Sequence, residues 1–241
     1  MTTVVIALHG GGEFLPGDEP FLTAILTAAP RDAGSVRVAV VPTAAARGRP
    51  DLAGANGVRA LERVALGLGA AIEAEVVPVL DARSAADPGL AARLAGATLI
   101  HLPGGDPDLI PALYPGSEAW MAILAALERG AVLAGASAGA MALAPVTWTP
   151  QGMVRGLGLV PGLIVVPHVG ASSWGRVLDR YGDRRPPGLG VLGLAERTGV
   201  IGRPGSPWEV AGEGEVRWLP PGVDAPGAAI VAGAPGTVEL A

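Results

Sequence analysis

The sequence contains no cysteine among its 241 residues, so the chain can form no disulfide, no thiolate metal site and no cysteine nucleophile. Lysine is also absent, and all 17 basic residues are arginine. Together with the abundance of Ala, Gly and Pro, this indicates a biased genome rather than a functional choice. The lack of cysteine is compatible with the cytoplasm, and we expect a cytoplasmic protein.

An excess of positive charge is missing as well, since the net charge is −5 and the pI is about 5.2. We therefore expect no nucleic-acid partner and no anionic membrane surface as partner. The N-terminal stretch Thr2 to Leu8 lacks a basic region and is interpreted as a first strand rather than a signal peptide. The charge-free stretch Gly130 to Trp148 is mostly Ala and Gly and contains Pro145, which favours a buried strand, turn and helix over a membrane span.

Short β-branched runs alternate along the chain with longer segments rich in Ala, Leu, Glu and Arg. This alternation predicts an α/β fold with a doubly wound, mostly parallel sheet covered by helices on both faces. We expect strands at residues 4–8, 36–41, 72–79, 97–100, 131–134 and 163–166, and helices at residues 19–29, 51–68, 84–94, 118–129 and 172–181. Short runs at 191–195, 198–201, 209–211 and 216–218 predict a small antiparallel edge. The length fits one domain over residues 1–241.

Ser137 stands at the centre of Gly-Ala-Ser-Ala-Gly, residues 135–139, between an apolar run and a helix-forming stretch. A strand that runs directly into a helix forces a sharp turn, and small neighbours leave the serine oxygen exposed at its tip. The backbone N–H after the serine then faces incoming negative charge. With 37 glycines in the chain the pattern alone is weak, so the flanking strand and helix carry the prediction of a nucleophile elbow.

All three histidines, His9, His101 and His168, lie at the ends of predicted strands, where a doubly wound sheet lines its ligand crevice. For His9 and His101 we expect hydrogen bonds to the backbone. A zinc site of three histidines is the alternative, but no paired spacing or acidic cluster supports it, and we expect no metal. His168 is the only histidine after the predicted nucleophile, which makes it the candidate base.

No Asp or Glu occurs between residues 138 and 167. This excludes the order serine, acid, histidine of the α/β-hydrolases. The acids beyond the last histidine begin with Asp179, Asp183 and Glu196. The first two lie among arginines, where an exposed ion pair is the usual explanation, whereas Glu196 ends an apolar strand.

Six segments spread over nearly the whole chain carry a family resemblance. They are Gly104-Gly105-Asp106 after a strand, Gly135 to Ala140, His168 after a strand, Gly188-Leu189-Gly190 leading to Glu196-Arg197-Thr198, Val41-Pro42-Thr43-Ala44, and Trp208-Glu209-Val210 with Glu213-Gly214. Together they resemble the serine-peptidase family of aspartyl dipeptidase (peptidase E) and cyanophycinase. The resemblance implies a class I glutamine amidotransferase-like fold and a triad of Ser137 as nucleophile, His168 as base and acid, and Glu196 as the residue that orients the imidazole.

The same resemblance implies that the backbone N–H groups of Gly105 and Ala138 form the oxyanion hole. The alternative for Gly104 and Gly105 is an ordinary tight turn before a helix. Asp106 is a candidate substrate-binding residue, but it is followed by Pro107 where the family often has a polar side chain.

The family also places arginines soon after the catalytic histidine, whereas here the first one is Arg176. Arg176 and Arg180 are candidates for binding a substrate carboxylate through the guanidinium fork, with solvated helix arginines as the alternative. Trp174 is expected either to wall the substrate pocket or to pack in the core.

The resemblance implies a serine exopeptidase that hydrolyses short peptides through an acyl-enzyme, as a dipeptidase or carboxypeptidase with a preference for acidic residues and without a cofactor. Two alternatives stay open. One is a cyanophycinase-like hydrolase of an Asp/Arg polymer, and the other is a catalytically silent small-molecule binding module of the same fold. A short peptide is the expected partner, and assembly into a homo-oligomer is left open.

Overall fold

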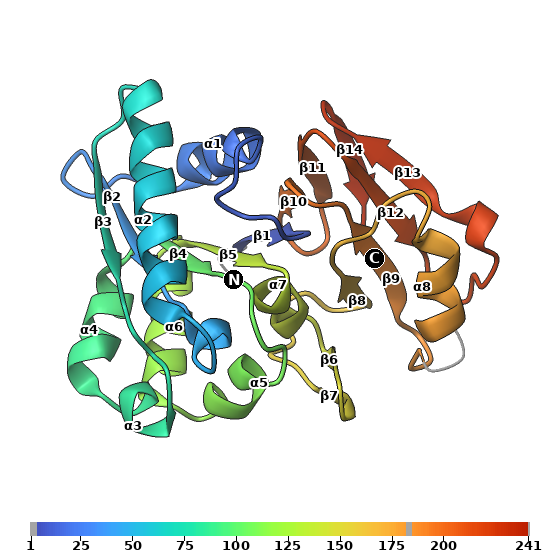
Figure 1. Ribbon diagram of the computed structural model, residues 1–241. Coiled ribbons are helices and arrows are strands. Elements are labelled where there is room, and N and C mark those ends of the chain that lie inside the picture. Colours follow the sequence, from blue (N-terminus) through green and yellow to red (C-terminus); the bar gives the residue numbers. More distant parts are fainter. Residues whose placement is uncertain (1–3, 182–184, 241) are drawn as a thin grey trace.

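The computed structural model describes residues 4–181 and 185–240 of the 241-residue chain (Figure 1). Its central sheet contains the strands β1 (Val5–His9), β2 (Val36–Val40), β3 (Ile72–Val76), β4 (Leu99–Leu102), β5 (Val132–Ala136), β10 (Thr198–Gly202), β11 (Pro207–Gly212) and β14 (Gly236–Glu239). Their order is β14-β11-β10-β1-β5-β4-β2-β3. The neighbours β1, β5, β4, β2 and β3 pair in parallel. On the other side of β1, the strands β10, β11 and β14 continue the sheet with antiparallel pairing. The α/β class, the mostly parallel sheet and the antiparallel edge are thus confirmed.

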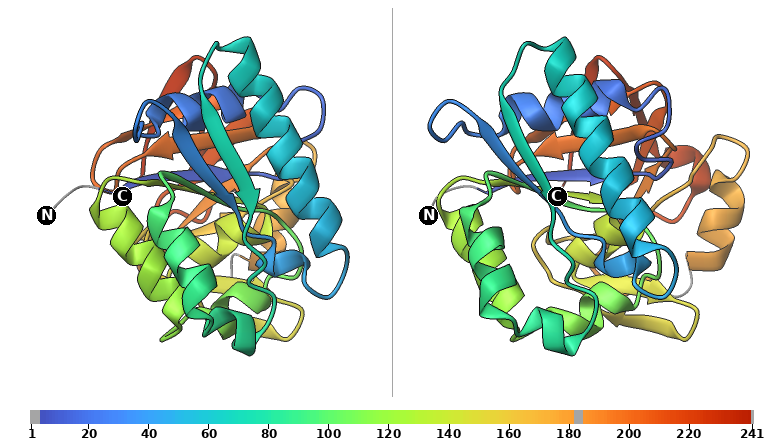
Figure 2. Two further views of the ribbon diagram at one scale, coloured as in Figure 1. Left: turned by 90° about the vertical axis from the view of Figure 1, so that its left-hand side faces the viewer. Right: turned by 60° about the vertical axis from the view of Figure 1, so that its left-hand side comes forward.

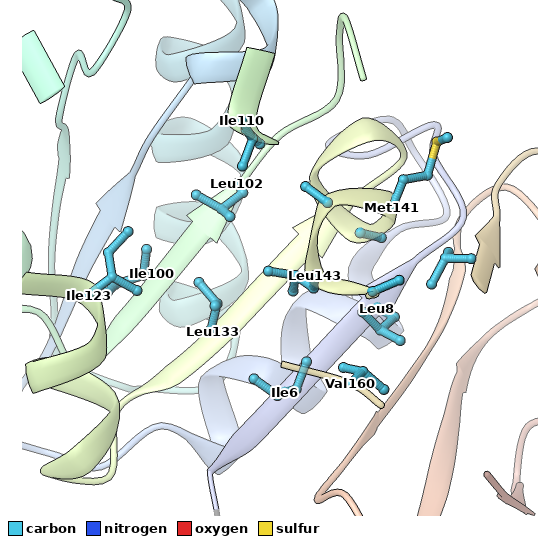
Figure 3. Packing of buried hydrophobic residues seen from close by; sticks show 14 of the residues in the cluster. Ile6, Leu8, Ile100, Leu102, Ile110, Ile123, Leu133, Met141, Leu143 and Val160 are labelled. Atoms are coloured by element: carbon cyan, nitrogen blue, oxygen red, sulfur yellow. The ribbon is translucent and has the colours of Figure 1, made fainter. Parts of the chain in front are cut away.

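Helices cover both faces of this sheet, as Figure 2 shows. One face carries α1 (Glu19–Ala28) and α2 (Pro50–Gly67), and the other carries α4 (Pro88–Gly96), α6 (Glu118–Glu128) and α7 (Ala138–Leu143). The alternation of side chains along a strand explains this division. Ile6 and Leu8 of β1 pack in one cluster with Ile123 of α6 (Figure 3). Ala7 packs in the other cluster with Phe21 of α1. The central strands are therefore buried on both faces.

A second sheet lies beside the first and was not predicted. It contains β8 (Leu163–Val166), β9 (Gly190–Leu194), β12 (Glu215–Leu219) and β13 (Ile230–Gly233), in the order β13-β12-β9-β8. We predicted the runs 163–166, 191–195 and 216–218 as part of one sheet, and this was wrong. An apolar run indicates that a strand is buried but does not specify the strand with which it pairs.

The second sheet is attached to the first through a shared core. Leu163 and Val165 point into the cluster that also contains Ile6 and Leu8 of β1, so this face of the second sheet packs toward the central sheet. Ile164 on the opposite face packs toward α8 (Trp174–Tyr181). This shared core holds the ends of β8 and β9 close to the ends of the parallel central strands.

The remaining differences from the predicted elements are local. The predicted helix at 84–94 is split into α3 (Ala82–Ala85) and α4, because Asp87 accepts the N–H groups of Gly89 and Leu90 and Pro88 begins a new helix. A short α5 (Leu109–Leu113) precedes α6. A hairpin of β6 (Val146–Thr149) and β7 (Gly152–Arg155) follows α7.

The charge-free stretch 130–148 forms β5, a turn, α7 and the start of β6, so the interpretation as buried strand, turn and helix is confirmed. Within residues 4–181 and 185–240, no helix combines the length and the apolar character that crossing a membrane requires.

Candidate active site

Ser137 occupies the sharp turn between β5 and α7. Its backbone has φ +49° and ψ −113°, a strained conformation for a residue with a side chain. Glycine is required on both sides of it. A Cβ atom on Gly135 would lie 2.6 Å from the carbonyl carbon of Gly139, and one on Gly139 would lie 2.1 Å from the carbonyl oxygen of Leu102. The two glycines of the motif therefore allow the strand, the turn and the helix to meet.

The hydroxyl of Ser137 contacts an imidazole that in turn contacts a carboxylate. Ser137 Oγ lies 2.9 Å from His168 Nε2, and His168 Nδ1 lies 3.0 Å from Glu196 Oε1. His168 follows β8 and Glu196 follows β9, and these two strands pair in parallel, so their ends coincide. The side chains of His168 and Glu196 are 48% and 53% exposed, which leaves the group accessible to a substrate.

Of the three acids that the sequence left open, Glu196 is therefore the one that contacts the imidazole. Asp179 lies exposed on α8, and Asp183 falls outside the described residues. In this geometry a neutral imidazole can take the proton of the hydroxyl through Nε2, while the carboxylate fixes the proton on Nδ1 and stabilises the imidazolium that forms.

His168 itself has φ +59° and is fixed by the loop that follows β1, residues 10–17, which we call the glycine loop. The backbone N–H of His168 donates to the carbonyl of Gly10 at 2.8 Å, and that of Arg197 donates to the carbonyl of Gly11 at 2.7 Å. A Cβ atom on Gly11 would lie only 2.2 Å from His168 Cε1. The glycine loop thus packs directly against the imidazole ring.

We expect Gly11→Ala to lower kcat about 100-fold, because the added methyl group must displace the ring of His168 from Ser137. The measurement is steady-state turnover of the peptide substrate that the resemblance implies, together with thermal unfolding. Gly34→Ala is the matched control, because Gly34 also has a positive φ, +91° against +102° for Gly11, but nothing lies within 4 Å of its Cβ position. An unchanged kcat in Gly11→Ala would show that this contact does not position the imidazole.

The two predicted oxyanion donors belong to the elbow itself and to the loop after β4, whose Gly104 lies close to Ser137. Ala138 is the first residue of α7, and Gly105 lies in the loop after β4 with φ +150°. A Cβ atom on Gly105 would lie 2.1 Å from the carbonyl oxygen of Ala44, so no other residue fits there. Neither N–H group has an acceptor within the described part of the chain. Both are therefore available to an oxyanion at this elbow.

A cavity of about 520 Å³ opens beside the Gly105 loop. Its walls are the glycine loop with Glu13, the segment from Ala44 to the start of α2 with Arg47 and Arg49, and Asp106. The guanidinium of Arg47 binds both carboxylate oxygens of Asp108 at 2.8 Å. The sequence pointed to Gly105 and Asp106 but not to Glu13, Arg47 and Arg49.

Glu13 is the most informative of the residues that were missed. Its Oε1 accepts the backbone N–H of Gly104 at 2.7 Å, which links the glycine loop to the Gly105 loop. The run of three glycines after the first strand was the available signal for this loop. β1 pairs directly with β5, and this pairing brings the end of the first strand next to the strand that leads to Ser137. That pairing was not visible in the sequence.

The other substrate-binding candidates lie elsewhere. Trp174 is 4% exposed and packs between β9 and α8, against Val169 and over Gly193. This position favours packing over contact with a substrate. Arg176 is exposed on α8 and is not among the residues that line the cavity, while the side chain of Arg180 falls outside the described part of the structure.

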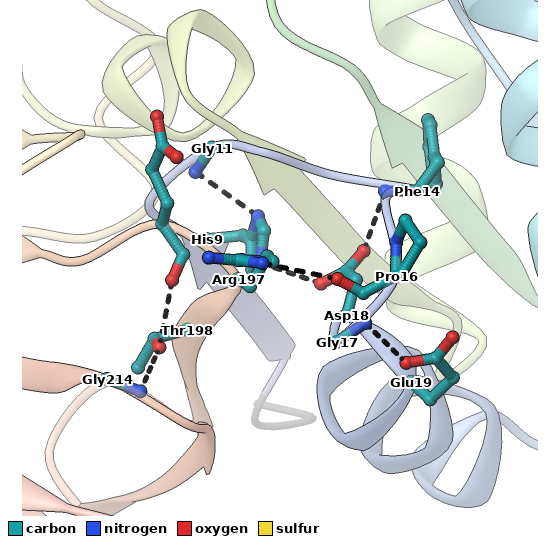
Figure 4. A network of polar contacts seen from close by, with 11 residues as sticks. His9, Gly11, Phe14, Pro16, Gly17, Asp18, Glu19, Arg197, Thr198 and Gly214 are labelled. Atoms are coloured by element: carbon teal, nitrogen blue, oxygen red, sulfur yellow. Dashed lines mark hydrogen bonds and ion pairs between the residues drawn. The ribbon is translucent and has the colours of Figure 1, made fainter.

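His9 and Asp18 form a fully buried pair below the glycine loop (Figure 4). His9 Nε2 lies 2.9 Å from Asp18 Oδ1, and His9 Nδ1 accepts the N–H of Gly11 at 3.3 Å. The second carboxylate oxygen of Asp18 accepts the N–H of Phe14 at 2.8 Å. The pair therefore fixes the segment from Gly11 to Phe14, which contacts His168 and carries Glu13. The backbone partner expected for His9 is present.

His101 is also completely buried, but neither of its ring nitrogens has a hydrogen-bond partner among the described residues. The expectation of a backbone partner for His101 was wrong. In His168, Nε2 faces Ser137 and Nδ1 faces Glu196, so neither nitrogen is directed at a shared metal position. Within the described residues no group of three or more His, Asp or Glu side chains is arranged to hold a metal ion.

Burial lowers the pKa of His101 from 6.5 to about 3, and repulsion from His9 acts in the same direction. Between these two values the unfolded chain binds a proton that the folded chain does not bind. The stability is therefore full above pH 6.5 and decreases as the pH falls toward 3, by about 1.4 kcal/mol per pH unit. Between pH 7 and pH 5 we expect the free energy of unfolding, measured with urea, to fall by about 2 kcal/mol more in the wild type than in His101→Leu. Identical pH dependence in the two proteins would contradict this assignment.

Comparison with known proteins agrees with this geometry. The model of peptidase family S51 matches residues 6–198, which is most of the chain. The chain belongs to peptidase family S51. It is accordingly a serine-type peptidase and a hydrolase, and the resemblance found in the sequence is confirmed.

Two solved structures share the fold of this S51 peptidase. A peptidase from an acI-B1 Actinobacterium has a TM-score of 0.79 and 24% sequence identity, with 99% of this chain and 97% of that chain covered. A putative peptidase E protein from Listeria monocytogenes EGD-e has a TM-score of 0.61 and 17% identity, with 88% of this chain and 98% of that chain covered. No curated protein matches the chain.

Proposed function

We propose that this S51 peptidase is a cytoplasmic serine exopeptidase that hydrolyses short peptides through Ser137, His168 and Glu196. His168 takes the hydroxyl proton through Nε2 while Ser137 Oγ attacks the scissile carbonyl carbon. The N–H groups of Gly105 and Ala138 stabilise the oxyanion of the tetrahedral intermediate. The imidazolium then donates its proton to the leaving amine, and an acyl-enzyme remains.

In the second half of the reaction a water molecule attacks the acyl carbon and gives its proton to His168. The protonated imidazole returns the proton to Ser137 Oγ as the acid product leaves. The observation that carries this proposal is the continuous contact from hydroxyl to imidazole to carboxylate, with separations of 2.9 and 3.0 Å. The half-exposed triad and the cavity beside it are consistent with peptide access.

The acidic preference is the finer part of the proposal and is supported by one residue of the cavity. Arg49 lines the cavity, and its guanidinium makes no hydrogen bond or ion pair with a residue of the described part of the chain. Arg47 is instead held by Asp108. A guanidinium without a partner is suited to bind a substrate carboxylate through two parallel hydrogen bonds.

A digest of a peptide library followed by mass spectrometry tests the substrate class. Loss of single residues or dipeptides from one end of short peptides supports an exopeptidase. Equal turnover of peptides blocked at both ends contradicts terminal recognition, and degradation of an Asp/Arg polymer instead of peptides indicates a cyanophycinase-like hydrolase.

Labelling with a fluorophosphonate probe separates an enzyme from a silent binding module. An activated serine reacts with the probe and leaves an adduct on Ser137, which mass spectrometry locates. An unlabelled Ser137 in folded protein would contradict the proposal.

A further inference from the structure

The carboxylate of Glu13 lies close to the nucleophile, with Gly104 between them. Glu13 is partly buried in the glycine loop, and no basic side chain of the described residues forms an ion pair with it. Its contact to Gly104 locates it with respect to Ser137. A methyl group on Gly104 would lie 2.9 Å from Glu13 Oε1, 3.0 Å from Ser137 Cβ and 3.5 Å from Ser137 Oγ. One atom-sized position therefore touches both the carboxylate and the nucleophile.

The carboxylate is held in place before any substrate binds. The N–H of Gly104 fixes Oε1 at 2.7 Å, and the buried pair of His9 and Asp18 fixes the backbone on both sides of Glu13. A charge that is held rigidly in a partly desolvated place attracts an opposite charge more strongly than a freely moving surface charge does. Glu13 also lines the cavity of about 520 Å³, so a ligand in that cavity can reach it.

The position of Glu13 defines which part of a peptide it meets. When a scissile carbonyl is placed between Ser137 Oγ and the N–H groups of Gly105 and Ala138, the α-nitrogen of the same residue is about 2.5 Å from the carbonyl carbon. A carboxylate that is separated from Ser137 only by Gly104 is therefore within reach of that nitrogen. The charged end of a Lys or Arg side chain lies several bonds farther away and would be placed deeper in the cavity.

We infer that Glu13 is the subsite for the free α-ammonium group of the substrate, so that the peptidase removes residues from the N-terminal end. This inference rests on the proposed exopeptidase function. A free N-terminal residue places a positive charge at Glu13, which forms a charge-assisted hydrogen bond. An internal residue presents a neutral amide at the same point, which leaves the carboxylate without a partner and adds an acyl group that must be accommodated.

Glu13→Gln isolates the charge, because the amide oxygen still accepts the N–H of Gly104. Glu19→Gln is the matched control, because Glu19 is an exposed acid that likewise accepts a glycine N–H at the other end of the glycine loop, from Gly17 at 2.8 Å. The substrates are p-nitroanilides of the residue that the peptide library favours, with a free or an acetylated α-amine.

We expect the wild type to favour the free amine and Glu13→Gln to lower kcat/KM for it about 10- to 100-fold. The acetylated substrate should be cleaved equally by both proteins, and Glu19→Gln should behave as the wild type. The pH profile provides a second readout. In the wild type kcat/KM for the free substrate falls above pH about 8 as the ammonium loses its proton, and this fall disappears in Glu13→Gln.

The contrary outcomes are distinct. Equal cleavage of free and acetylated substrates by the wild type, or an equal loss on both in Glu13→Gln, overturns the subsite and leaves a purely structural role for Glu13. If Glu13→Gln selectively lowers the cleavage of acetylated Lys substrates, the carboxylate binds a basic side chain. This result also overturns the α-ammonium subsite. Fluorophosphonate labelling of Ser137 in both proteins shows in these cases that the proposed peptidase function stands, whereas absent labelling together with absent hydrolysis rejects both proposals.

Discussion

Ser137→Ala is expected to lower kcat for peptide hydrolysis about 10⁵-fold or more, because no other group can form the acyl-enzyme. The variant keeps the backbone N–H groups of Gly105 and Ala138, so a residual rate above the uncatalysed reaction remains from oxyanion stabilisation and binding. The fold should persist, since alanine fits the same turn and, among the described residues, the hydroxyl hydrogen-bonds to His168 alone.

The measurement is single-turnover hydrolysis combined with fluorophosphonate labelling and a thermal unfolding curve. Ser206→Ala is the control, because Ser206 has an exposed hydroxyl on a turn closed by Arg203 and should change neither rate nor labelling. If Ser137→Ala remained active to within tenfold while folded, the nucleophile would have to be a different group.

Glu196→Gln is expected to lower kcat about 10³-fold with little change in stability. The amide retains the size of the carboxylate but no longer stabilises the imidazolium. It also no longer holds the proton of the neutral His168 ring on Nδ1. The loss is smaller than for the nucleophile because the side chain is 53% exposed, so that water solvates part of the imidazolium charge.

The pH dependence of kcat/KM and the labelling rate of Ser137 measure this change. Asp179→Asn is the matched control, because Asp179 is an exposed acid on α8 that the sequence left open as the third member of the triad. Full activity in Glu196→Gln, or a large loss in Asp179→Asn, would mean that the acid was assigned incorrectly.

Most of the secondary structure around the central sheet follows from local sequence. The strand at Val132–Ala136 and the turn at Ser137 were predictable because a buried apolar run, two glycines and a helix-forming segment occur consecutively. The break before α4 was missed because an Asp-Pro pair ends one helix and begins another, and the propensity of the flanking residues hides this boundary.

Part of the site was predictable for the same reason. Ser137, His168 and Glu196 each follow an apolar run, and the absence of Asp and Glu between residues 138 and 167 restricted the order in which a triad could occur. Glu13 was not predictable, because its importance depends on the contact with Gly104, which lies 91 positions away in sequence. Burial also could not be read from the residue type, since Trp174 packs in a core and His101 is enclosed with no hydrogen-bond partner in the described part of the chain.

The sequence by itself determined the α/β class, the elbow at Ser137 and the identity of the three residues that meet there, because these depend on local runs, on the order along the chain and on a family resemblance. Only the tertiary structure decided that His168 and Glu196 follow strands of a second sheet and that the glycine loop holds both the imidazole and a carboxylate close to Ser137. The physical reason is that strand pairing and side-chain burial depend on contacts between segments far apart in sequence, and a local pattern does not contain that information.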